Sequence, residues 1–396
     1  MTARIAAMLA LATAGCGGPP RGDQSGTSVD RSGRFPILTS VGEPSLWPAT
    51  PVFEVGGVPP RGAELGSARS VLLAADGRLI VVDPSYRSIL EFDSTGTLLR
   101  RIGREGPGPG EYREPYSVAW LGDTLALLDP GNGRIGFFGA DDRWLASWPV
   151  PRITGGQFVR LYRTPGAFWS FSLRQATTGS EGIFVEYSGS GPSDTIVAVR
   201  TAPGLPVSRT CRTPDGGLTF FALPFGGSLI AIPTGHGEQA ITVTSQYAVA
   251  ILGSSGDTIR LIRRTRAPVP VTDAEWRDAN VEWTAFRAQW PAASCDHGEF
   301  PRQLVKPAIT SMFLDDQGRL WVEVATESGV RFDVFDREGH LQGTVVGLPP
   351  SGGIDPSVSG DRIALVGEDS TEVPVVRVFR FDQRRPGRGP GRPVDK

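Results

Sequence analysis

Short runs of alternating apolar and polar residues recur along this chain at a fixed distance. The stretches 70–103 and 117–148 each contain four such runs divided by turn residues. Ser70 corresponds to Ser117, and Asp83 corresponds to Asp129, so the offset is 46 or 47 positions. A repeat of this length with alternating runs predicts one four-stranded antiparallel sheet per unit.

Fainter copies of the unit follow at residues 158–199 and 218–263, a clear one at 309–346 and a short one at 358–381. Within 218–263 we expect strands near 218–223, 228–232, 246–252 and 257–263. The last copy has only three runs. Five full units and one short unit predict an all-β fold, a six-bladed β-propeller of four-stranded antiparallel blades over residues 50–382.

A Gly/Pro-rich connector precedes the inner strand of a blade. The connector "IGREGPGPGEYREPYSV" (residues 102–118) has a counterpart at residues 55–71. The second connector implies an outer strand at Pro51–Val55 with no blade before it. Because the short last unit lacks an outer strand, we expect this N-terminal strand to complete the sixth blade and close the ring.

The segment "DGRLIVVDPSYRSILEFDSTG" resembles the NHL-type repeat of six-bladed propellers, and the resemblance extends over residues 52–150 and 305–346. It implies a fold more than a function. Lyases of this type hold zinc through histidines near the channel, but His236, His297 and His340 do not reproduce that pattern. Lactonase-like propellers bind a divalent cation, and their ligands find no residue-by-residue match here. No cofactor is therefore predicted, and Ca²⁺ or Zn²⁺ stays open.

The N-terminus is typical of an exported protein. An apolar run at residues 5–14 is too short to span a bilayer and suits a signal peptide. Thr13-Ala14-Gly15-Cys16 resembles the bacterial lipobox, which implies lipidation of Cys16 and a membrane-anchored lipoprotein of the cell envelope. Plain secretion is the alternative. We expect a signal peptide at 1–16, a flexible tether at 17–49 and a disordered basic tail at 383–396.

Charge gives no reason to expect a nucleic-acid partner. The 396-residue chain has a net charge of −2 at pH 7, and nucleic-acid binding depends on a strongly positive surface. The basic run Arg260–Arg266 is the exception. Strand alternation places its arginines on an outer strand face, where they are solvated.

Residues 265–306 interrupt the repeat. Thr272 and Glu275 form a capping box, which predicts one helix of about 18 residues. Four aromatic residues fall on one face of this helix: Trp276, Trp283, Phe286 and Trp290. This face either packs on the propeller surface or serves as a lid or docking face for a partner.

Two cysteines remain besides Cys16. An exported compartment permits a disulfide between Cys211 and Cys295, which would join the end of the insertion to the start of the fourth blade. The alternative is two unpaired buried thiols.

The candidate binding residues lie where inner strands begin. Ligands of propellers commonly meet the funnel at these ends, which here carry Arg69, Tyr116, Arg160 and Asp355. They could bind a solute, or they could be solvated channel residues. Asp83 and Asp129 each end a second strand, and their repetition favours a structural role in the turn that follows.

These observations favour a binding module for an unknown ligand or envelope protein, tethered to the bilayer. The alternative is a lactonase- or lyase-like enzyme with its site at the channel mouth. No catalytic residue is predicted.

Overall fold

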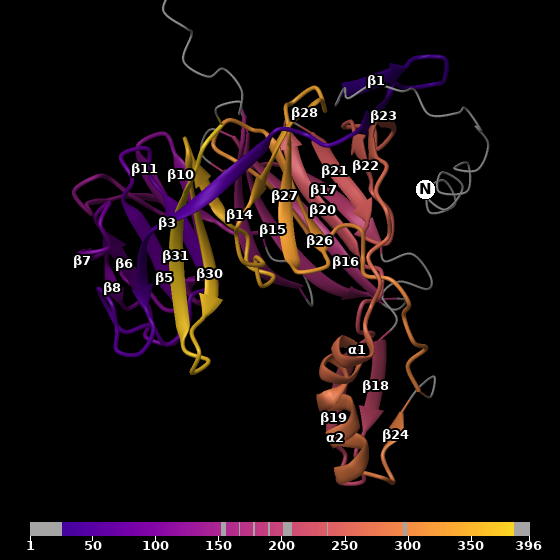
Figure 1. The fold of residues 1–396 in the computed structure, drawn as a ribbon. Helices are drawn as coiled ribbons and strands as arrows, with labels where there is room; N and C mark the ends of the chain where they lie inside the picture. Colours follow the sequence, from indigo (N-terminus) through magenta and orange to yellow (C-terminus); the bar gives the residue numbers. More distant parts are fainter. Residues whose placement is uncertain are drawn as a thin grey trace, which may run out of the picture.

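The computed structural model describes residues 26–151, 156–165, 167–176, 179–188, 191–200, 208–235, 237–295 and 299–383. In this part of the chain strands dominate, and the two α-helices lie close together in the sequence (Figure 1). The prediction of an all-β fold is confirmed. The predicted signal peptide and nearly all of the basic tail lie outside the described residues.

The two clearest sequence repeats form four-stranded antiparallel sheets, which we call blades 1 and 2. Blade 1 consists of β4 (Ser70–Leu73), β5 (Leu79–Asp83), β6 (Ser88–Phe92) and β7 (Leu98–Arg101). Blade 2 consists of β10 (Ser117–Leu121), β11 (Thr124–Asp129), β12 (Arg134–Phe138) and β13 (Trp144–Pro149). Every residue of β5 and β6 is buried, as expected for apolar runs that are covered on both faces of a sheet.

The weaker repeats form blades 3, 4 and 5. Blade 3 consists of β14 (Gly156–Thr164), β15 (Ala167–Ala176), β16 (Gly179–Ser188) and β17 (Gly191–Arg200). Blade 4 consists of β20 (Leu229–Gly235), β21 (Glu238–Val243), β22 (Ala248–Leu252) and β23 (Thr258–Arg264). Blade 5 consists of β25 (Ser311–Leu314), β26 (Leu320–Thr326), β27 (Gly329–Phe335) and β28 (Leu341–Val346).

The last unit receives its fourth strand from the N-terminal region. Blade 6 consists of β29 (Ser357–Ser359), β30 (Arg362–Glu368), β31 (Pro374–Phe381) and the second half of β3 (Leu46–Gly56). Ala49 pairs with Phe381, and Gly56 pairs with Val375, in antiparallel register. The predicted pairing of the segment Pro51–Val55 with the last strand is therefore confirmed.

Part of the predicted tether is ordered, which corrects the boundary given by the sequence. Within 17–49, β1 (Gly26–Asp30) pairs with β2 (Ile37–Val41), and β2 runs parallel to β23 of blade 4. The first residues of β3 run parallel to β28 of blade 5. The segment 26–56 thus lies along the outer strands of blades 4, 5 and 6 (Figure 1). Strands β2 and β3 gain hydrogen bonds from the edges of blades 4, 5 and 6, and the sequence alone does not predict such pairing.

Hydrophobic clusters lie between neighbouring blades. In each of six clusters, apolar side chains from two blades pack together: blades 1 and 2, 2 and 3, 3 and 4, 4 and 5, 5 and 6, and 6 and 1. The last of these joins Val376 and Val378 of β31 to Val71 and Leu79 of blade 1. At about 25 cal/mol per Å² of apolar surface, such burial is the main favourable term in the fold.

The Gly/Pro-rich connectors contain glycines that a side chain could not replace. Gly103 has φ of 65°, and a Cβ there would lie 2.9 Å from the carbonyl oxygen of Gly110. Gly56, its counterpart before blade 1, has φ of 87°, and a Cβ would lie 2.5 Å from the carbonyl oxygen of Pro374. Both positions need a left-handed conformation and close backbone approach, which explains the glycine. Between blades 1 and 2 the connector also forms a short parallel pair, β8 (Arg104–Glu105) with β9 (Glu111–Tyr112).

The insertion is larger than predicted and has its own sheet. Strands β18 (Ser208–Arg212), β19 (Leu218–Ala222) and β24 (Ser294–Cys295) form a three-stranded sheet. It lies with α1 (Asp273–Ala279) and α2 (Val281–Gln289), and the group projects from the blades at the bottom of Figure 1. The strand expected near 218–223 therefore does not belong to blade 4. We call residues 208–222 and 265–306 the arm.

The predicted single helix is two helices. The capping box is present, since Thr272 Oγ1 accepts from the backbone N–H of Glu275 at 3.2 Å and the Glu275 carboxylate accepts from the backbone N–H of Thr272 at 3.0 Å. At Asn280 the chain leaves the helical conformation, with φ of −108° and ψ of 10°. The Asn280 side chain bonds back to the carbonyl of Trp276 at 2.7 Å, a local bond that competes with helix continuation.

Candidate functional site

A cavity of about 290 Å³ lies among the inner strands of the blades. It is lined by residues of β4, β10, β14, β25 and β29 and of the loops that lead into them. Three of the four predicted channel-mouth residues, Arg69, Arg160 and Asp355, line this cavity. Tyr116, the fourth, contacts Arg69. The structure therefore brings the four predicted residues to one region.

Arg160 and Asp355 form an ion pair that joins blade 3 to the loop before blade 6. Arg160 Nη1 lies 2.7 Å from Asp355 Oδ2, and the two side chains are 31% and 23% exposed. The Tyr162 hydroxyl lies 3.5 Å from the same nitrogen. Polar groups that are partly exposed in a cavity wall can form hydrogen bonds with a bound solute and fix its orientation.

Burial and charge act together on the ionisation of this group. Burial raises the pKa of the Asp355 carboxyl, and the Arg160 guanidinium opposes that shift. Burial lowers the pKa of Arg160, but the Asp355 carboxylate more than offsets this, so the pKa of Arg160 is raised overall. Burial also raises the pKa of Tyr162 to about 12. The Tyr162 hydroxyl therefore stays neutral and Arg160 stays charged at neutral pH.

Arg69 and Tyr116 occupy equivalent positions, one residue before the inner strands of blades 1 and 2. Their backbone N–H groups donate to Val82 and Leu128, each at 3.0 Å. The guanidinium carbon of Arg69 lies 5.1 Å from the centre of the Tyr116 ring, within the range of a cation–π contact. Among the described residues, no carboxylate lies within ion-pair distance of Arg69.

Buried carboxylates hold the connectors that carry these two residues. Asp83 accepts from the backbone N–H of Gly66 at 2.8 Å and of Ser67 at 3.1 Å. Asp129 accepts from the backbone N–H of Glu114 at 2.9 Å. Both carboxylates therefore have the structural role that the sequence predicts. Their main partners, however, are in the connector before the blade rather than only in the following turn.

Three serines at the cavity link successive inner strands, which the sequence analysis did not predict. Ser70 Oγ accepts from the backbone N–H of Val118 at 3.2 Å, and Ser117 Oγ accepts from that of Leu161 at 3.1 Å. Ser357 Oγ accepts from the backbone N–H of Leu73 at 2.9 Å. The recurrence of Ser70 as Ser117 was the available signal, because the repeat of a polar residue in an apolar strand needs a polar partner.

The aromatic residues of the arm form its own small core. Trp283 is 6% exposed, and its ring centre lies 5.2 Å from that of Phe221 on β19 and 5.1 Å from that of Phe300. Phe286 packs on Phe221 as well. Trp276 and Trp290 are half-buried, and Arg302 lies over the Trp276 ring. Trp283 and Phe286 thus pack within the arm rather than on the propeller surface.

Cys211 and Cys295 are bonded to each other, with 2.03 Å between the sulfur atoms. They pair directly across β18 and β24. The predicted disulfide is present, but the expectation that it joins the insertion to blade 4 is wrong, because both cysteines lie in the sheet of the arm.

Arg264 corrects the interpretation of the basic run. Its side chain is 1% exposed and forms an ion pair with Asp333, which also accepts from the Tyr247 hydroxyl at 2.7 Å and the Thr344 hydroxyl at 2.5 Å. The nearby chain at Gly42 covers it. This arginine therefore belongs to the contact between blades 4 and 5.

Histidines contribute no metal site in the part of the chain that the structure describes. His236 and His297 lie outside the described residues, and His340 Nδ1 lies 3.3 Å from Asp336. No group of three or more metal-ligating His, Cys, Asp or Glu side chains lies together in the described ranges.

Residues 64–147, which include blade 1 and most of blade 2, match the model of a family described as a 6-bladed beta-propeller. This match supports the propeller interpretation of the recurring units. No curated protein matches the sequence.

Several solved structures resemble the fold at low sequence identity. Regucalcin from Agrobacterium tumefaciens is 11% identical, with 85% of this chain and 96% of that chain covered and a TM-score of 0.40. A Bacteroides fragilis protein described as exported is 10% identical, with coverage of 84% and 95% and a TM-score of 0.43. Virginiamycin B lyase from Staphylococcus aureus is 10% identical, with coverage of 84% and 99% and a TM-score of 0.38. At this level the matches carry no information on function.

Proposed function

We propose that this chain is an exported, membrane-tethered six-bladed propeller that binds a small polar ligand in its central cavity. The observation that carries the proposal is the half-buried ion pair of Arg160 and Asp355 at the wall of the cavity. What distinguishes this pair from other partly exposed ion pairs is its position in the wall of a cavity where several blades meet.

The proposal includes a closed ring. It is supported by the pairing of β3 with β31, by the hydrogen bond from Leu73 in blade 1 to Ser357 in blade 6, and by the apolar cluster between these blades. A closed ring gives the cavity its complete wall. It also leaves inner strand ends of several blades pointing at one solute, as propeller sites commonly do.

The size of the cavity favours a small molecule over a protein segment. Ligand cavities range from about 300 to 1,000 Å³, and this one has about 290 Å³. A compound of metabolite size fits such a volume, and a folded partner does not.

Attachment to the membrane is the second part of the proposal. It is supported by the lipobox-like sequence that ends at Cys16. Mass spectrometry of the N-terminal peptide of protein purified from bacterial membranes tests it. We expect an acylated Cys16, and a Cys16→Ser variant should be released in soluble form. An unmodified residue 16 in membrane-purified protein contradicts the anchor.

Ligand-detected NMR tests binding in the cavity. Saturation-transfer spectra of a mixture of small polar metabolites would be recorded with the wild type, with Arg160→Gln/Asp355→Asn, and with Arg143→Gln, an exposed arginine of blade 2. We expect at least one compound to lose its signal in the double variant and to keep it in Arg143→Gln. Equal signals from all three proteins contradict the proposed function.

A further inference from the structure

The side chains that line the cavity offer more unused hydrogen-bond donors than unused acceptors. Four arginines line it, namely Arg69, Arg160, Arg163 and Arg337. Arg69 and Arg163 have no carboxylate within ion-pair distance among the described residues. Only Nη1 of Arg160 is engaged, by Asp355 and Tyr162, and a guanidinium has five N–H donors. Cationic donors therefore remain for a bound group.

The three carboxylates at the cavity are committed to the protein. Asp315 bonds to Arg319 and to the indole N–H of Trp321. Asp316 accepts from the Ser359 hydroxyl at 3.0 Å and from the backbone N–H of Gly360 at 3.2 Å. Asp355 is paired with Arg160. Asp315 and Asp355 are balanced by Arg319 and Arg160. Asp316 has only neutral donors and keeps its charge, but Arg69, Arg163 and Arg337 outnumber it in the lining.

The serines add neutral donors. Ser70, Ser117 and Ser357 all line the cavity, and each hydroxyl oxygen accepts from a backbone N–H of the next inner strand. A hydroxyl that accepts one bond still has its own O–H to donate. In the described part of the chain these three hydroxyl protons have no acceptor.

From this imbalance we infer that the ligand of the cavity is a small organic anion, which Arg69 and Arg160 bind through its carboxylate or phosphate group. The inference rests on the proposed function and names the class of ligand. Guanidinium groups suit both kinds of anion because two parallel N–H groups match two oxygen atoms. Arg69 is oriented by the Tyr116 ring and Arg160 by Asp355, so little side-chain order is lost when the anion binds.

The experiment compares charged probes with neutral ones of the same shape. Isothermal titration at low ionic strength would measure succinate against succinamide, and glycerol 3-phosphate against glycerol, with wild-type protein. We expect one of the two anions to bind at least about tenfold more tightly than its neutral counterpart, which is about 1.4 kcal/mol. Arg69→Gln should weaken that anion about tenfold, whereas the matched exposed variant Arg143→Gln should leave it unchanged.

Arg160→Gln leaves Asp355 without its partner and could impair folding. Arg69 is exposed and is therefore the primary variant, and Arg160→Gln/Asp355→Asn is the second, with folding checked by circular dichroism. Equal affinities for the anions and their neutral counterparts overturn the inference, and so does equal weakening by Arg143→Gln. A third outcome separates the two proposals. Neutral compounds could give NMR signals that the double variant abolishes while neither anion binds in the titration. Ligand binding would then be supported and the anion class contradicted.

Discussion

The hydroxyl oxygen of Ser357 accepts a hydrogen bond from the backbone N–H of Leu73 at 2.9 Å, although 284 positions separate the two residues. This bond joins the inner strand of the last blade to that of the first. Ser357→Ala should lower the free energy of unfolding by about 1–2 kcal/mol, because a partly buried N–H loses its acceptor. Urea unfolding followed by fluorescence measures the loss. Ser255→Ala, at an exposed turn, is the control, and an equal effect of the two variants would contradict the role of Ser357 in joining the blades.

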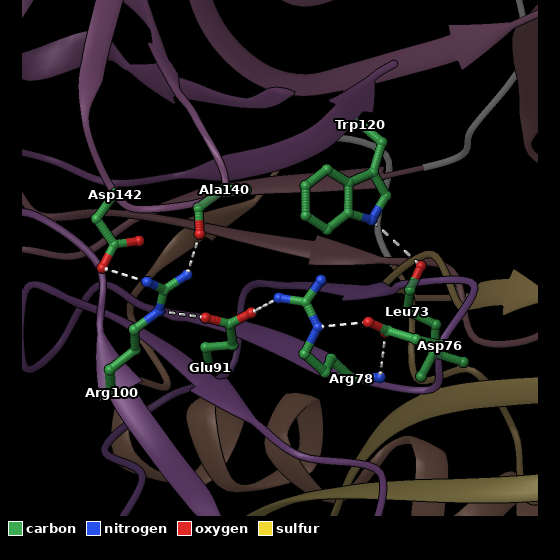
Figure 2. Close-up of polar contacts among 8 residues, drawn as sticks. All are labelled: Leu73, Asp76, Arg78, Glu91, Arg100, Trp120, Ala140 and Asp142. Carbon is green, nitrogen blue, oxygen red and sulfur yellow. Dashed lines mark hydrogen bonds and ion pairs between the residues drawn. The ribbon is translucent and has the colours of Figure 1, made fainter. Parts of the chain in front are cut away.

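Glu91 on β6 is the centre of a chain of ion pairs that links blade 1 to blade 2 (Figure 2). Its carboxylate is 2% exposed and pairs with both Arg78 and Arg100, and Arg100 continues to Asp142 of blade 2 at 3.1 Å. Glu91→Gln should destabilise the protein by about 1–3 kcal/mol, because two guanidinium groups lose a buried counter-charge.

Glu105→Gln is the matched control for Glu91→Gln. Glu105 also pairs with an arginine, but both partners are more than half exposed, and exposed pairs contribute about 0–1 kcal/mol. The urea midpoints of the two variants measure the two losses of stability, and we expect the larger loss for Glu91→Gln. The interpretation of Glu91 fails if Glu105→Gln costs as much.

Loss of the disulfide should loosen the arm and leave the blades folded. Cys211 and Cys295 are 84 positions apart, and crosslinks that close loops of this length contribute up to about 4–5 kcal/mol. The contacts of Trp283 and Phe286 with Phe221 would then be the main link between the helices and β19. Cys211→Ala/Cys295→Ala should be cleaved by trypsin within residues 208–222 or 265–306, where the oxidised protein resists. Cleavage that begins within blades 1 or 2 would show instead that the crosslink supports the whole fold.

The stability contributed by Glu275 should depend on pH. Lys306 and Thr272 lower the pKa of Glu275 from 4.5 to about 2. A carboxyl with a lowered folded-state pKa stabilises the fold above its unfolded pKa, and this contribution is lost as the pH falls through 4.5 toward about 2. Glu275→Gln should therefore lower the thermal midpoint at about pH 6.5 and much less at about pH 2.5.

Glu282→Gln, at an exposed position of α2, is the control for this measurement. Its midpoint should follow that of the wild type across the same pH range. A difference between Glu275→Gln and wild type that grows on acidification has the wrong sign and would rule out this account of the Glu275 carboxylate.

The strands that the sequence predicted best are those in which local pattern and final environment agree. Blades 1 and 2 were readable because their middle strands are mostly apolar and their turns carry Gly, Asp and Pro, such as Asp76-Gly77 in blade 1. Arg69, Tyr116 and Asp355 lie just before inner strands, as predicted, whereas Arg160 lies within β14. The contact of Arg160 with Asp355 did not follow, because it joins blades 3 and 6, which are far apart along the chain.

Several errors come from contact between segments that are distant in the sequence, whereas the break of the predicted helix at Asn280 has a local cause. Arg264 was expected to face solvent, but β1 and β2 add to the edge of blade 4 and the chain at Gly42 lies over it. The strand at 218–222 alternates like a blade strand, yet it pairs with β18 and is covered by α2. Alternation predicts that a strand is half-buried, but not what covers it.

The pairing of β3 with β31 determines when blade 6 can fold. Thr50 on this strand bonds to the carbonyl of Arg380, 330 positions later, so its edge has no partner until almost the whole protein has been synthesised. An unpaired edge is a template for aggregation. Pro48 and Pro51 each remove a backbone donor from β3, which disfavours pairing with wrong partners before β31 is available. The last blade can assemble only when both ends of the polypeptide are present together, so a chain truncated before β31 should fail to complete its fold.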